Sequence, residues 1–139
     1  MTNVESSLWL RRAAAQGYAP AFVRVGDDYR DGRGGTVKNP AQAIGWRRRG
    51  AAARDCDAEA ALAAMLFVGE GVAADPIQGY AWALIYQWDD RGNSKYWVAE
   101  SLRADLARAM TPVQIAQSER LAVTWRPDVI VEPQRERFR

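Results

Sequence analysis

The sequence contains no histidine and only one cysteine among its 139 residues. The lack of histidine removes the commonest general base and the commonest ligand of transition metals. Hydrolases that depend on serine, cysteine or zinc are therefore improbable, and we expect no catalytic residue, no metal and no cofactor. The single cysteine, Cys56, cannot form an internal disulfide, which agrees with a reducing compartment, and we expect it to be a buried structural thiol.

The sequence also lacks long hydrophobic runs. No stretch approaches the roughly 18 uncharged apolar residues of a membrane span. The opening "MTNVESSLWLRRAAA" has neither a basic start followed by an apolar run nor a cleavage site. We therefore expect a cytoplasmic protein with no membrane span, or a periplasmic one if a signal peptide has been removed. A hydrophobic share of 48% is still enough for the core of one domain.

Strong charge of one sign is missing as well. The net charge of +2 is too small to imply nucleic acid as a partner. Its distribution is uneven, because residues 1–54 carry ten Lys and Arg against four Asp and Glu, whereas residues 55–139 carry nine against thirteen. Such a dipolar chain can be steered towards a charged protein. Chance placement of solvated charges is the alternative.

What the sequence does contain is a repeat. Trp9, Trp46 and Trp82 are 37 and 36 residues apart, and "GRGGTVKNPAQAIGWRRR" from residue 32 has the layout of "GEGVAADPIQGYAWALIY" from residue 69. Around the tryptophans, the same register relates Ala14 to Ala51, Ala21 to Ala58, Gly32 to Gly69, Gly34 to Gly71 and Pro40 to Pro76. The difference of one residue falls before Pro40, which predicts a loop there.

Each unit has the pattern of two helices. In the first helix, one face carries Ala21, Val25, Gly26 and Tyr29, and a glycine follows its end. Asn39 as N-cap and Pro40 in the first turn predict the start of the second helix, and Asp75 with Pro76 repeat that signal. Small residues suit helices that approach closely, and they lie at Ala21, Gly26, Ala43, Ala58, Ala63 and Gly79.

The run "WLRRAAAQGYAPAFVRVGDDYRDGRG" followed by "PAQAIGWRRRGAAA" resembles the Sel1-like repeat, a relative of the tetratricopeptide repeat found in bacterial proteins. The matching positions are Ala21, Val25, Gly26, Tyr29, Gly32, Gly34, Ala43, Trp46, Ala51 and Ala52. The second copy departs from the pattern, with Ala63 for the helix glycine, Leu66 for the tyrosine and Arg54 for the turn glycine. The ending "LRADLARAMTPVQIAQSERLAVTWRP" is similar to the closing segment of many members.

The repeat and the resemblance together predict an all-α solenoid of stacked helical hairpins in residues 1–127. Within it we expect a half-repeat at 5–17, repeats at about 19–54 and 56–91, and a capping helix pair at 94–125 that begins its last helix with a capping box of Thr111 and Gln114. The helix Tyr80–Trp88 is apolar all round, so the cap must cover it, with Trp97, Leu102, Leu106, Val113, Leu121 and Trp125 as candidates. Trp46 and Trp82 should be largely buried, and residues 128–139 should form an extended or mobile tail.

Several chemical signals are weak. The turn "DGRGG" lacks the preceding strand and the Lys-Ser or Lys-Thr pair of a phosphate loop. Asp27, Asp28 and Asp31 lack the alternation of a calcium loop. A basic stripe of Arg11, Arg12, Arg47, Arg48, Arg49 and Arg54 has three interpretations: a solvated face, a patch for an acidic protein, or a patch for nucleic acid.

The resemblance implies a protein-protein interaction module, an adaptor or scaffold that binds a protein or peptide on its concave face. By analogy with tetratricopeptide geometry, the partner-binding residues are Val23, Asp27 and Arg30 in the first repeat and Ala60, Ala64 and Phe67 in the second. We expect no nucleic acid and no small-molecule substrate. An immunity protein that neutralises a secreted bacterial toxin is the alternative within this class, so that the partner is a toxin or a subunit of a complex; an enzyme is the remote alternative.

Overall fold

The computed structural model describes residues 3–89 and 96–125, and every described element is a helix. The helices are α1 (Asn3–Ala15), α2 (Ala19–Asp31), α3 (Pro40–Ala52), α4 (Cys56–Val68), α5 (Pro76–Asp89), α6 (Tyr96–Ala107) and α7 (Pro112–Trp125). The predicted all-α class is confirmed. The predicted tail and the side chain of Trp97 lie outside the residues whose structure and side chains are described.

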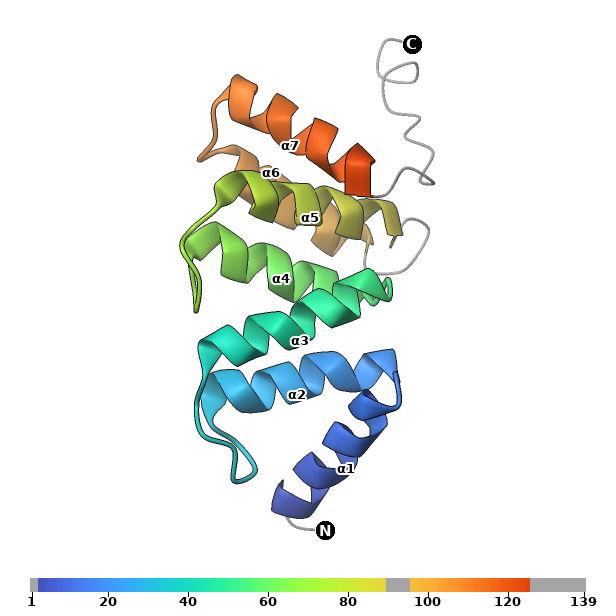
Figure 1. Ribbon diagram of the computed structural model, residues 1–139. Coiled ribbons are helices and arrows are strands. Elements are labelled where there is room, and N and C mark those ends of the chain that lie inside the picture. The colour runs from blue at the N-terminus through green and yellow to red at the C-terminus, as the bar shows by residue number, and fades with distance from the viewer. Residues whose placement is uncertain (1–2, 90–95, 126–139) are drawn as a thin grey trace.

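Helices α1 to α5 are stacked in the order of the sequence, α7 lies beyond α5 at the far end of the stack, and α6 lies behind α5 in the view of Figure 1. Two antiparallel hairpins, α2 with α3 and α4 with α5, form the middle, and α6 and α7 both pack against α5. One core cluster joins α3, α4, α5 and α7, and a smaller one joins α1 and α2. The molecule is therefore a solenoid in which most contacts link neighbouring helices.

The helix starts are capped as the sequence predicts. Asn39 Oδ1 accepts a hydrogen bond from the backbone N–H of Gln42 at 3.2 Å, and Asp75 Oδ1 accepts one from Gln78 at 3.0 Å. The capping box is also present, because the Gln114 N–H donates to Thr111 Oγ1 at 3.2 Å and the Thr111 N–H donates to Gln114 Oε1 at 2.9 Å. These bonds fix where the loops end and the second helix of each unit begins.

The turns between helices use left-handed backbone. Gly32 (φ 73°) and Gly69 (φ 82°) end α2 and α4 and donate their N–H groups to the carbonyl oxygens of the last turn. In the second loop, a Cβ on Gly71 would lie 2.6 Å from the carbonyl carbon of Pro40, so this loop rests directly on the start of α3. Arg54 has φ 63°, a left-handed conformation at the position where the repeat pattern has glycine.

The two helices of each hairpin cross at a glycine. A Cβ on Gly26 would lie 3.2 Å from the carbonyl oxygen of Ala43, and a Cβ on Gly79 would lie 3.0 Å from the carbonyl oxygen of Ala63. All four residues are buried, as the close approach of the helices requires. The predicted role of the small residues is confirmed at both crossings.

The apolar helix α5 is covered by α6 and α7 as expected, but the prediction that Val113 helps to cover it is wrong, because Val113 is 67% exposed and lies outside the core. The indole of Trp82 lies 5.0 Å from that of Trp125 on α7, and the hydroxyl of Ser118 donates to the carbonyl oxygen of Ile77 at 2.8 Å. On the other side, α6 contributes Leu102 and Leu106 to the same core. Residues of α5 from Gly79 to Tyr86 are buried in consequence.

The three repeated tryptophans differ in burial. Trp82 is 9% exposed, Trp46 is half-buried, and Trp9 is 58% exposed. The prediction of a largely buried tryptophan is therefore confirmed for Trp82, whereas Trp46 packs on the core but is less completely covered, because no described helix lies over α3 as α7 lies over α5. Cys56 likewise differs from expectation, since it is half-buried at the start of α4.

Candidate functional site

The predicted partner-binding residues lie on two helices that contact each other, α2 and α4. Ala64 is exposed, and the other five, Val23, Asp27, Arg30, Ala60 and Phe67, are half-buried. The buried sides of α2 face away from these positions, because Phe22 and Gly26 contact α3 while Asp28 is bonded to α1. We call the accessible strip made by the six residues the α2–α4 face.

One end of the α2–α4 face is tied to α3 by an ion pair. Asp27 Oδ1 accepts a hydrogen bond from Nη2 of Arg47 at 2.6 Å. The Arg47 side chain is 3% exposed and that of Asp27 is 35% exposed. Gly26 leaves room for the arginine, since a Cβ there would lie 3.4 Å from Arg47 Cγ. The assignment of Arg47 to an outer basic stripe is therefore wrong. Asp27, which is partly exposed to solvent, neutralises the buried charge of Arg47.

The same end carries a small cluster of exposed charges. Arg30 donates to both carboxylate oxygens of Asp31, at 3.1 and 3.3 Å, and Arg33 Nη2 lies 3.1 Å from Asp31 Oδ2. The hydrogen bond from Arg30 lowers the pKa of Asp31 below its ordinary value, and the bond to Asp31 raises the pKa of Arg30. Arg30 is thus held in a fixed direction at the edge of the face.

The other end of the α2–α4 face is apolar. Ala60, Ala64 and Phe67 occupy on α4 the repeat positions of Val23, Asp27 and Arg30. The next residue, Val68, is 70% exposed. The face therefore changes from polar on α2 to apolar on α4.

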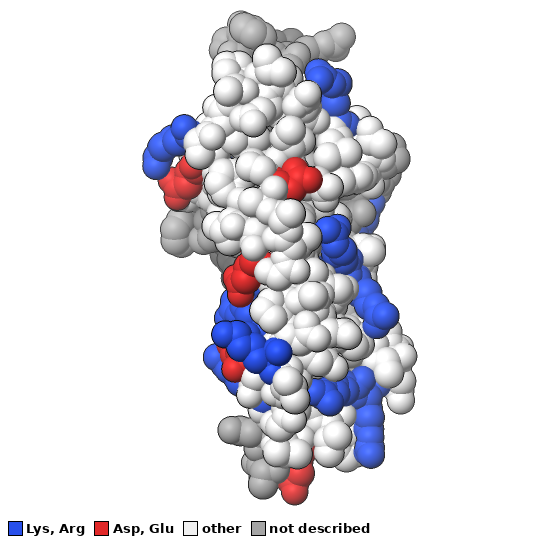
Figure 2. Space-filling view, turned by 60° about the vertical axis from the view of Figure 1, so that its left-hand side comes forward, with Lys and Arg blue, Asp and Glu red and all other residues white. Residues whose placement is uncertain are grey.

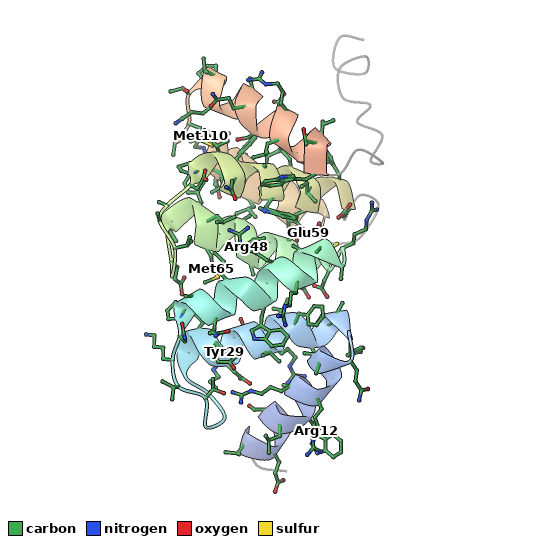
Figure 3. All side chains as sticks on the ribbon, in the orientation of Figure 1. Arg12, Tyr29, Arg48, Glu59, Met65 and Met110 are labelled. Carbon is green, nitrogen blue, oxygen red and sulfur yellow. The ribbon has the colours of Figure 1, made fainter. Side chains whose placement is uncertain are left out.

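A second polar group lies between α1, α2 and the loop that follows α2. The Ser7 hydroxyl donates to Asp28 Oδ2 at 2.8 Å, Arg11 donates to the hydroxyl of Thr36, and the Arg11 guanidinium stands 5.2 Å from the ring centroid of Tyr29, a residue labelled in Figure 3. Ser7, Asp28 and Thr36 are buried. Arg11 thus anchors α1, and its assignment to the outer basic stripe is also wrong.

The aspartates of α2 are not gathered into one cluster. Asp27, Asp28 and Asp31 have different partners, so they do not converge on one point. Throughout residues 3–89 and 96–125, no group of three His, Cys, Asp or Glu residues is placed to hold a metal ion. Among the same residues, no helix has both the length and the apolar character that crossing a membrane requires.

Two solved structures are similar to this fold. The SLR-fold protein c5321, a protective antigen present in uropathogenic Escherichia coli strains, aligns with a TM-score of 0.81 and 25% sequence identity, over 91% of this chain and 26% of that one. A Sel1 repeat protein from Oxalobacter formigenes aligns with a TM-score of 0.67 and 21% identity, over 96% of this chain and 50% of that one. The chain therefore spans about a quarter and a half of the lengths of these two neighbours.

A scan against models of protein families finds no match, and a search of curated proteins finds none either. The irregular second copy, with Ala63 and Leu66 at signature positions, is consistent with a weak sequence signal. The two hairpins nevertheless share their backbone geometry, since both cross at a small residue and both first helices end in left-handed glycine. The repeat pattern of the sequence and the likeness of the fold agree, because the chain has the solenoid fold of the Sel1-like repeat structures.

Proposed function

We propose that the protein is an interaction module that binds a protein or peptide partner on the α2–α4 face. The observation that carries the proposal is the α4 end of the face, where Ala64 and Val68 are exposed although nothing in the hairpin requires apolar residues there. Exposed apolar positions next to oriented charges are typical of protein-binding surfaces. Helical repeat proteins commonly bind extended or helical segments on the face of the first helices.

The residues of the α2–α4 face indicate the chemistry of the partner segment that it binds. An apolar side chain of the partner packs on Ala60, Ala64 and Phe67, where it removes apolar surface from water. A polar or acidic group of the same segment lies towards α2, where Arg30 is oriented by Asp31. The partner accordingly has one apolar side and one acidic end.

The experiment uses Ala64→Arg, which places a long charged side chain on the apolar end without touching the core. Wild type and variant are used to purify partners from the native cell, and the recovered partner is then titrated by calorimetry. We expect Ala64→Arg to weaken binding by roughly tenfold or more, because an apolar contact is replaced by a buried unpaired charge. Val123→Arg, a similar change at an exposed residue of α7, should leave the affinity unchanged.

Equal affinity of Ala64→Arg and wild type would contradict the proposed face. Recovery of a secreted toxin as the partner would assign the immunity role, and recovery of a complex subunit would assign the adaptor role. Recovery of nucleic acid in place of protein would overturn the function.

A further inference from the structure

We propose that the outer sides of α1 and α3 form a second binding surface, which takes an acidic segment of a protein partner. The surface consists of Trp9 and Arg12 on α1 and of Trp46, Arg48 and Arg49 on α3. We call it the tryptophan–arginine face. It is separate from the α2–α4 face and does not depend on the function proposed for that face.

The first observation is a repeated pairing of arginine with tryptophan. The guanidinium carbon of Arg12 lies 5.1 Å from the ring centroid of Trp9, and that of Arg49 lies 4.6 Å from that of Trp46. Both pairs have the same three-residue spacing and the same position in the repeat. Each guanidinium therefore lies over an indole, and this contact reduces the entropy lost when the arginine binds an anion.

The second observation is that the pairs are accessible. Trp9 is 58% exposed, Trp46 is half-buried against Phe22, and Arg12, Arg48 and Arg49 are exposed. The equivalent position on the next hairpin, Trp82, is instead covered by Trp125 of α7. The position that is covered on α5 is thus presented to solvent on α1 and is partly accessible on α3.

The third observation is that these cations have no carboxylate partner in the structure as described. Arg30, Arg33, Arg47 and Arg108 each form an ion pair with an aspartate, whereas Arg12, Arg48 and Arg49 form none with a described residue. Figure 2 shows blue side chains following one another down the right-hand side of the view, from the middle of the molecule towards its base, with no red one among them. Arg12 and Arg48 are labelled on α1 and α3 in Figure 3.

The chemistry of this face selects a carboxylate-rich segment. A guanidinium stacked on a ring still presents its N–H edge, which matches the two oxygens of an Asp or Glu side chain. The exposed part of the Trp9 ring offers apolar contact beside those charges, as the anchors of protein interfaces do. A segment that alternates acidic and apolar residues satisfies both features.

The charge of the whole chain favours a short acidic segment over a nucleic acid. The excess of Lys and Arg is confined to residues 1–54, and residues 55–139 carry nine Lys and Arg against thirteen Asp and Glu. A long polyanion that ran past the first hairpin would meet repulsion from the acidic half. A short segment that touches only α1 and α3 avoids it.

The test measures the fluorescence anisotropy of a labelled peptide of alternating glutamate and leucine with the full chain. We expect wild type to bind it more weakly as salt is added, and we expect Arg12→Glu with Arg49→Glu to lose roughly tenfold or more in affinity. The matched control is Arg24→Glu with Arg120→Glu, which changes the net charge equally at exposed arginines of α2 and α7 and should lose much less. Circular dichroism establishes that each variant is folded.

Two further variants separate binding from structure. Trp9→Ala removes a largely exposed ring and should weaken peptide binding without changing the melting temperature. Arg12→Lys with Arg49→Lys keeps the charge but loses the planar guanidinium over each indole, so intermediate affinity is expected. Ala64→Arg on the α2–α4 face should bind this peptide as wild type does.

The proposal is overturned if wild type does not bind the acidic peptide, or if the Arg12 and Arg49 reversal binds no worse than its matched control. It is also overturned if a single-stranded oligothymidine binds more tightly than the peptide through the same residues, since the surface would then belong to nucleic acid.

Discussion

The two hairpins of the solenoid share a backbone pattern but differ in chemistry. Where α2 and α3 carry charges, α4 and α5 carry apolar residues. The charged positions are Asp27, Asp28, Arg30, Asp31, Arg47, Arg48 and Arg49, and their counterparts are Ala64, Met65, Phe67, Val68, Ala83, Leu84 and Ile85. For α3 and α5 the difference follows from position in the stack, because α6 and α7 cover α5 while no described helix covers α3 in the same way. On α4 the cover does not explain it, since Ala64 and Val68 are exposed.

The two hairpins also bring their helices close together with the small residues in opposite places. In the hairpin of α2 and α3, the crossing glycine is Gly26 on α2 and it meets Ala43 on α3. In the hairpin of α4 and α5, the glycine is Gly79 on α5 and it meets Ala63 on α4. Gly26 leaves space for the stem of Arg47, whose charge is met by Asp27, whereas Ala64 and Ala83 stand at those two charged positions in the other hairpin. The repeat thus specifies the distance between helices rather than the residue that achieves it.

The largest expected difference between the two hairpins is in the stability lost when their equivalent tryptophans are truncated. Trp82→Ala should cost about 3–5 kcal/mol of unfolding free energy, as burial under Trp125 implies, and half-buried Trp46→Ala only about 1–2 kcal/mol. Urea denaturation measures both. Equal losses of unfolding free energy would show that the cover by α7 does not stabilise α5. Trp9→Ala, at an exposed position, is the control and should change the unfolding free energy little.

The ion pair between the helices of the first hairpin gives the next largest effect. Asp27→Ala leaves Arg47 buried and unpaired, and should cost about 2 kcal/mol, less than the roughly 3–5 kcal/mol of a fully buried pair because Asp27 is partly exposed. Asp27→Ala with Arg47→Met, which imitates the apolar hairpin, should recover much of that loss. A double-mutant cycle measures the coupling, and additive losses would mean that the pair does not matter.

The crossing glycines should differ in tolerance. Gly79→Ala places a methyl group 2.9 Å from the backbone nitrogen of Phe67 and should destabilise by about 1–3 kcal/mol. Gly26→Ala meets its nearest atom at 3.2 Å and gains helix propensity, so we expect a change of less than about 1 kcal/mol. Thermal melts of the two variants test this order, which the reverse result would refute.

The turns before α2 and α4 form a smaller matched pair. Gly17 (φ 87°) serves the first turn, and Arg54 (φ 63°) serves the second in a conformation that costs an L-residue energy. Arg54→Gly should raise the unfolding free energy by about 0.5–1 kcal/mol. Arg54→Ala is the control for loss of the side chain, and if it stabilises as much as Arg54→Gly, backbone strain is not the cause.

The smallest effect concerns acid. The hydrogen bond from Arg30 lowers the pKa of Asp31, so its contribution to stability is present above the ordinary carboxyl pKa and is lost as pH falls through the lowered value. Val68, at the equivalent position on α4, cannot titrate. Asp31→Asn should therefore flatten the loss of melting temperature below about pH 4. An unchanged acid slope would exclude this pair as a source of the pH dependence.

The fold was predictable because its signals are local and repeated. Asn39, Asp75 and Thr111 mark helix starts through their own side chains, and each cap is present. The spacing of the tryptophans and of the loop glycines predicted the hairpins. The cover over α5 followed from its lack of a polar side, which a helix in water cannot sustain.

The binding surfaces were less predictable because they depend on which neighbour covers a helix. Arg47 was placed in the outer basic stripe because it is adjacent to Arg48 and Arg49 in the sequence. The same position in the other copy of the repeat is Ala83, which indicates that the position faces inward. The recurrence of tryptophan and arginine three residues apart could have indicated the stacked pairs. The exposure of Trp9 could not be read from the repeat, because it results from the place of α1 at the end of the described stack.

The contact of Gly71 with Pro40 bears on the curvature of the array. Since a Cβ at Gly71 would lie 2.6 Å from the Pro40 backbone, the loop after α4 limits how one hairpin can tilt on the next. Side chains within the helices can then change from charged to apolar without altering this angle. In a longer array with the same loop glycine, we expect this contact to recur at each step and to contribute to the pitch of the superhelix.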